Sequence, residues 1–104
     1  MLEKRIEKKL VDAVRAAGGM CLKFVSPGMD GMPDRIMLMP FGRMAFVEIK
    51  APGKKPRPLQ RFRHDLLRKL GFQVFVLDRP EDIPYLMAAF NVLVEPQTEA
   101  LLRQ

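Results

Sequence analysis

The chain has 104 residues, of which 48% are hydrophobic and 29% are charged, as is typical of one small globular domain. No apolar run approaches the roughly 20 residues that a membrane-spanning helix needs, and the charged N-terminus is unlike a signal peptide, so no membrane association is expected. Lys and Arg number 18 against 12 Asp and Glu; this net charge of +6 suits a polyanionic partner, although a basic surface without nucleic acid would look the same.

Apolar residues recur every three or four positions over residues 2–17, which predicts an amphipathic helix that ends at Gly18-Gly19. Three short apolar segments then predict strands: residues 20–25, 35–39 and 44–50. A loop rich in Gly and Pro separates the first two strands, and a tight turn over residues 40–43 joins the second to the third. Cys21, the only cysteine, excludes an internal disulfide and is expected to pack as a small hydrophobic residue in a reducing cytoplasm.

The second half of the chain begins with a stiff basic loop over residues 51–58. A helix is predicted over residues 59–70, and Gly71 ends it. One face of this helix is apolar and consists of Leu59, Phe62, Leu66 and Leu70. The remaining predicted elements are a strand over 73–77, a helix over 81–90 interrupted by Pro84, a strand over 92–94 and a last helix after Pro96.

The order of these elements is helix, three strands, helix, strand, helix. The tight turn over residues 40–43 requires an antiparallel hairpin, whereas the helix before the last long strand requires a parallel crossover. The sequence therefore predicts an α/β fold with a mixed central β-sheet flanked by helices.

Charged residues stand at the ends of the predicted hairpin, where an apolar core would not require them. Glu48 and Lys50 share one face of their strand because side chains alternate between faces. The tight turn would bring Asp34, at the head of the preceding strand, beside them. Two neighbouring carboxylates repel each other unless a cation such as Mg²⁺ neutralises them. The alternative is that Glu48 and Lys50 form an ion pair and that Asp34 caps a strand.

These residues match a known motif pattern. Pro33-Asp34 followed by Glu48-Ile49-Lys50 resembles the core motif of the PD-(D/E)xK nucleases. Further matching segments are Gly31-x-Pro33-Asp34-Arg35-Ile36, Phe46-Val47-Glu48-Ile49-Lys50-Ala51-Pro52, Gln60, and Gly71-Phe72-x-Val74. Together they resemble the VRR-NUC domain, the virus-type replication-repair nuclease, in its small standalone phage form. The resemblance covers residues 1–90 and implies a restriction-endonuclease-like core of order α-β-β-β-α-β; residues 91–104 would be a C-terminal extension.

The resemblance implies roles for individual residues. Asp34 and Glu48 would bind Mg²⁺ or Mn²⁺ together with the backbone carbonyl of Ile49, and Lys50 would be the catalytic lysine. Gln60 would hydrogen-bond near the active centre or the DNA backbone, although a glutamine in the first turn of a helix is more often a surface residue.

The family also places a glutamate of the first helix near the metal, and Glu3 and Glu7 are the candidates. Glu7 is preferred because it borders the apolar stripe of that helix, although a solvated surface acid would look the same. His64, a lone histidine in the middle of a predicted helix, is given no role.

Basic residues lie in the loop after the third strand and at the start of the next predicted helix: Lys54, Lys55, Arg57 and Arg61. They are expected to contact the DNA backbone, which positions a duplex without reading its sequence. The resemblance implies a metal-dependent DNA endonuclease acting on branched DNA, above all Holliday junctions, in the cytoplasm of a bacterium or a phage-infected cell.

Two symmetric nicks in a four-way junction need two active sites, so a homodimer is expected, with residues 92–102 as a candidate interface. A non-catalytic basic DNA-binding accessory protein remains the alternative from another class. A flap, single-strand or restriction-type nuclease on the same core remains the alternative within the enzyme class.

Overall fold

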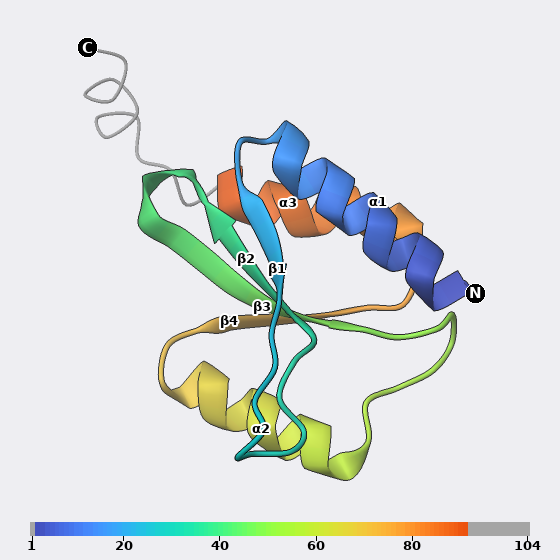
Figure 1. Cartoon of the computed structure of the whole chain (residues 1–104), viewed down its shortest axis with the longest axis vertical. Coiled ribbons are helices and arrows are strands. Elements are labelled where there is room, and N and C mark those ends of the chain that lie inside the picture. Colours follow the sequence, from blue (N-terminus) through green and yellow to red (C-terminus); the bar gives the residue numbers. More distant parts are fainter. Residues whose placement is uncertain (1, 92–104) are drawn as a thin grey trace.

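A single mixed sheet of four strands, in the order β1-β2-β3-β4, forms the centre of the computed structural model, which describes residues 2–91 (Figure 1). The elements are α1 (Leu2–Ala16), β1 (Met20–Lys23), β2 (Arg35–Met39), η1 (Pro40–Gly42), β3 (Arg43–Ile49), α2 (Pro58–Lys69), β4 (Gln73–Leu77), η2 (Pro80–Asp82) and α3 (Ile83–Asn91). The first three strands pair antiparallel, and β3 and β4 pair parallel. The predicted mixed sheet with flanking helices is confirmed.

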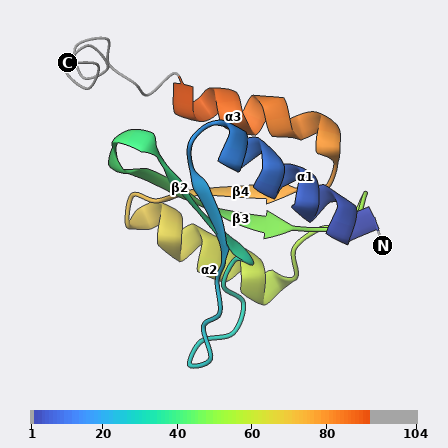
Figure 2. The same ribbon diagram turned by 45° about the horizontal axis from the view of Figure 1, so that its top comes forward.

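Helices cover both faces of the sheet (Figures 1 and 2). On one face, α1 and α3 pack against buried residues of β2, β3 and β4 in the larger core cluster, and the partly buried Cys21 packs there as predicted. On the other face, α2 contributes Leu67 to a smaller cluster with Phe46 and Val74. The sheet therefore has a larger apolar core on the face covered by α1 and α3 than on the face covered by α2.

The hairpin of β2 and β3 sets the position of the charged residues. Met39 pairs with Arg43 across η1, and Arg35 pairs with Val47 at the other end. The turn is tight because Phe41 and Gly42 both adopt positive φ, at 70° and 72°, a conformation that costs Phe41 more than the glycine. This register brings Asp34, one residue before β2, opposite the end of β3, as the sequence predicts.

Some predicted boundaries are wrong. Strand β1 ends at Lys23 rather than at residue 25, although the Phe24 N–H still donates a hydrogen bond of 2.8 Å to the Asp34 carbonyl. Pro84 does not interrupt a helix: η2 precedes α3, and Pro84 occupies the first turn of α3, where its missing N–H has no intrahelical partner to lose.

The strand predicted over 92–94, the helix after Pro96 and the interface segment 92–102 lie outside the described residues. Within residues 2–91, none of the helices combines the length and apolar character that crossing a membrane requires.

Candidate active site

Glu48 is the centre of a polar cluster beneath α2. Its side chain shares the α2-facing side of β3 with Phe46, and the residue is only 1% exposed. The Nε2 of Gln60 donates a hydrogen bond of 2.9 Å to Glu48 Oε2, and Lys50 Nζ lies 3.5 Å from the same oxygen. Gln60, Lys50 and Glu48 are therefore brought together as the sequence predicts.

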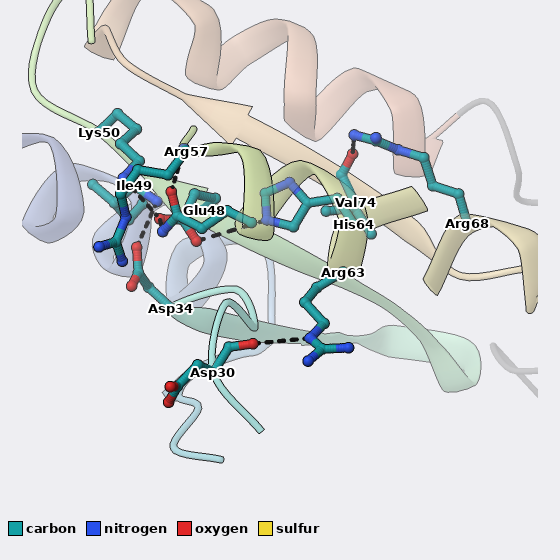
Figure 3. A network of polar contacts seen from close by, with 11 residues as sticks. Asp30, Asp34, Glu48, Ile49, Lys50, Arg57, Arg63, His64, Arg68 and Val74 are labelled. Carbon is teal, nitrogen blue, oxygen red and sulfur yellow. Dashed lines mark hydrogen bonds and ion pairs between the residues drawn. The ribbon is translucent and has the colours of Figure 1, made fainter. Parts of the chain in front are cut away.

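Asp34 lies beside this group at the end of the sheet (Figure 3). Its Oδ2 accepts a hydrogen bond of 2.9 Å from the backbone N–H of Ile49, which ties the carboxylate to the last residue of β3. The backbone N–H of Lys50 donates to the Leu77 carbonyl at 2.9 Å, so Lys50 continues the parallel pairing one residue beyond β3. The backbone that carries all three charged residues is thus held by the sheet.

Gln60 is buried, and so is not the surface residue that its position in the first helical turn alone would favour. Its Oε1 accepts a hydrogen bond of 2.8 Å from the backbone N–H of Arg57, while its Nε2 donates to Glu48. One amide therefore connects the end of the basic loop to the buried acid.

Burial makes the Glu48 carboxylate an unusual group at neutral pH. Desolvation, together with the nearby charge of Asp34, raises the pKa of Glu48 from 4.5 to about 7, against the opposing effect of Lys50. Glu48 Oε1 is buried and has no hydrogen-bond partner among the described residues. An unpaired buried acceptor of this kind is energetically costly, so this oxygen is a strong candidate to bind a cation or a hydrogen-bond donor.

His64 is the residue that sequence reasoning missed. It is 1% exposed, and its Nε2 lies 3.8 Å from Glu48 Oε1 (Figure 3). Burial, with a further contribution from the charge of Arg68, lowers the pKa of His64. The available signal was its spacing: residues four apart on a helix share a face, so His64 had to lie beside Gln60.

Glu7 is not gathered with the two acids. Its Oε2 accepts a hydrogen bond of 2.9 Å from Arg35 Nε, and Arg35 also donates to the Cys21 carbonyl at 3.2 Å. Among the described residues, no group of three or more His, Cys, Asp and Glu side chains is placed to hold a metal. The Arg35 side chain therefore competes for the Glu7 carboxylate, and a metal-binding role for Glu7 stays a prediction. Glu3 is exposed.

Basic side chains surround the loop between β3 and α2. Lys54, Lys55 and Arg61 line a hollow of about 450 Å³ that also includes His64 and Arg68. Arg57 is exposed but does not line this hollow. A second hollow of about 520 Å³ is lined by residues that include Arg5, Lys9, Pro52, Gly53 and Arg79.

The chain is similar in sequence and in fold to proteins described as nucleases. A curated relative, "Putative nuclease p44" of Acyrthosiphon pisum secondary endosymbiont phage 1, is 51% identical over 89 residues, which cover 86% of this chain and 95% of the relative. A solved structure described as a VRR_NUC domain superposes with a TM-score of 0.81 at 32% identity, covering 85% of this chain and 96% of its own. No protein-family model matches the sequence.

Proposed function

The chain belongs to the VRR-NUC family of nucleases, whose fold is of the PD-(D/E)xK type, and from this premise we propose that it is a metal-dependent endonuclease that hydrolyses phosphodiester bonds in DNA. The observation that carries the proposal is the Glu48 carboxylate, which is buried, has an unbonded oxygen and lies beside a second acid and a lysine. A structural ion pair between Glu48 and Lys50 would not account for the unbonded oxygen.

The residues present fit a hard divalent cation. Asp34 and Glu48 offer carboxylate oxygens at the end of the sheet, and such oxygens are the ligands that Mg²⁺ and Mn²⁺ prefer. We propose that these two acids and the Ile49 carbonyl hold the ion, and that Glu7 joins them only if its bond to Arg35 opens. When bound, Mg²⁺ or Mn²⁺ supplies a Lewis acid that polarises the phosphate.

Lys50 is suited to act on the phosphate. Its Nζ is held 3.5 Å from Glu48 Oε2, and its side chain is 18% exposed, so it can reach a ligand at the surface. An ammonium group here orients the attacking water and stabilises the negative charge that develops on the phosphate oxygens. Lys50 thereby lowers the barrier without itself forming a covalent bond.

Lys54, Lys55 and Arg61, in the hollow beside His64, and the neighbouring Arg57 are suited to contact DNA phosphates. His64, which lines the same hollow, lies 3.8 Å from Glu48 Oε1, so a backbone bound there would pass close to that acid. Phosphate contacts carry no base information, which favours recognition of DNA shape over sequence.

A branched substrate and a homodimer are the finer part of the proposal. A four-way junction cut symmetrically needs two active sites, and a chain of this size provides one. Four apolar side chains of α2 are exposed, and a second copy of the chain could cover them: Leu59, Phe62, Leu66 and Leu70. This stripe is a candidate interface within the described residues.

The test is cleavage of labelled four-way junction, flap and linear duplex with Mg²⁺, Mn²⁺ or EDTA. Asp34→Ala and Lys50→Ala should each lower the rate at least a hundredfold. Asp30→Ala and Lys69→Ala, which remove exposed charges elsewhere, are the matched controls and should cleave normally. Paired symmetric nicks would support a dimeric junction-cutting enzyme, whereas a preference for flaps or linear DNA would support the alternative nucleases.

Metal-independent binding without any cleavage would identify an accessory DNA-binding protein instead. Cleavage that survives both Asp34→Ala and Lys50→Ala would refute the assignment of the site.

A further inference from the structure

His64 faces the one oxygen of Glu48 that has no partner. Glu48 Oε1 and His64 Nε2 are both buried, neither has a hydrogen-bond partner in residues 2–91, and 3.8 Å separates them. Leaving a buried donor or acceptor unpaired costs roughly 1–3 kcal/mol for each group. Two such atoms facing each other can satisfy each other if the gap between them closes to hydrogen-bond length.

Gln60 and His64 approach Glu48 from the same side. They are four residues apart in α2, so they lie about one helical turn apart on the face that meets β3. Gln60 Nε2 is 2.9 Å from Glu48 Oε2, and His64 Nε2 is 3.8 Å from Glu48 Oε1. Each side chain therefore faces a different oxygen of one carboxylate.

We propose that His64 is a positioning residue for Glu48. Its Nε2–H donates to Oε1 when the gap between the two atoms closes to hydrogen-bond length, while Gln60 donates to Oε2. A donor on each oxygen would restrict rotation of the carboxylate, while Oε1 keeps a second lone pair for a metal ion. The consequence for the metal rests on the proposed function, in which Glu48 is a ligand.

Contact with DNA does not explain the buried position of the His64 side chain. The residue is 1% exposed, whereas the lysines and arginines that line the neighbouring hollow are exposed and can reach a phosphate. An outer residue that orients a ligand typically changes metal affinity or activity by about 10- to 100-fold when it is removed. Loss of His64 should therefore weaken metal binding and leave DNA binding unchanged.

The test uses three variants of the full chain. His64→Phe keeps a planar ring but removes the donor, His64→Gln keeps a donor, and Leu67→Ala removes a buried side chain from the same helix without contacting the Glu48 carboxylate. Binding of Mn²⁺ is measured by electron paramagnetic resonance at one fixed pH, and DNA binding is measured in EDTA. We expect His64→Phe to raise the Kd for Mn²⁺ about 10- to 100-fold and His64→Gln to restore a substantial part of it.

Leu67→Ala should lower the melting temperature while changing the Mn²⁺ Kd by no more than about twofold, because it disturbs packing only. In cleavage assays at saturating Mn²⁺, His64→Phe should lower kcat with little change in KM for DNA. Mn²⁺ binding by His64→Phe equal to that of the wild type, or an equal loss in Leu67→Ala, would overturn the positioning role alone. A wild-type chain that neither binds Mn²⁺ nor cleaves DNA would overturn the proposed function as well.

Discussion

The two long helices meet the sheet in opposite ways. In α1 the apolar stripe is buried, and Ile6, Leu10 and Val14 are at most 2% exposed. In α2 the apolar stripe points outward, with Phe62 55% exposed, and the buried face carries Gln60 and His64 beside Leu67. The buried residues of α1 are thus all apolar, whereas α2 combines the apolar contact of Leu67 with the polar contacts of Gln60 and His64 to one acid of β3.

The largest expected difference between the two helices is the loss of stability when a leucine of each apolar stripe is truncated. Leu10→Ala in α1 should destabilise the protein by about 2–5 kcal/mol, because it opens a cavity in a fully buried cluster. Leu66→Ala in α2, at 39% exposure, should cost less than about 1 kcal/mol. Urea unfolding measures both differences; a cost for Leu66→Ala as large as that for Leu10→Ala would show that α2 also depends on its apolar stripe.

Glu48, the β3 acid that the polar face of α2 covers, should make the stability of the metal-free protein depend on pH. Glu48 has a folded-state pKa of about 7 against 4.5 ordinarily, so between these values the folded state holds a proton that the unfolded state has lost. Stability from this group is complete below about pH 4.5, falls as the pH rises, and is lost above about pH 7, by at most about 3 kcal/mol.

Unfolding of Glu48→Gln, measured over the same range, isolates this effect from that of His64, whose lowered pKa acts in the opposite direction. The variant should lose the decline between pH 4.5 and pH 7. An unchanged decline in Glu48→Gln would show that another group titrates there.

A substitution on the exposed apolar stripe of α2 should have the smallest effect on the stability of the monomer. Phe62→Glu should change the free energy of unfolding by less than about 0.5 kcal/mol, because the ring is already largely in water. If the stripe joins two copies, the same substitution should halve the mass seen by light scattering at a concentration where the wild type is dimeric. Tyr85→Glu in α3, 77% exposed, is the matched control and should leave the mass unchanged.

The sequence was sufficient for the hairpin and for most of its chemistry. Alternation along β3 placed Glu48 and Lys50 on one face, and the turn after Met39 determined the register that brings Asp34 beside them. These features are local, since they depend only on strand geometry and on a connection of three residues. The strands and α1 were predicted from the spacing of their apolar residues, which is also a local feature. The parallel crossover was predicted from the helix that separates two strands.

Only the tertiary structure decided which face of α2 is buried and which partner each polar side chain meets. The pattern of Leu59, Phe62, Leu66 and Leu70 predicts an amphipathic helix but does not say that this stripe lies in solvent. The buried face of α2 instead carries Leu67 with Gln60 and His64, which meet Glu48, a residue of another element. Likewise, Glu7 meets Arg35 of β2, 28 residues away, because the sheet brings that guanidinium beneath α1. Side-chain partners that are distant in sequence are set by how helices dock on the sheet, which no local pattern records.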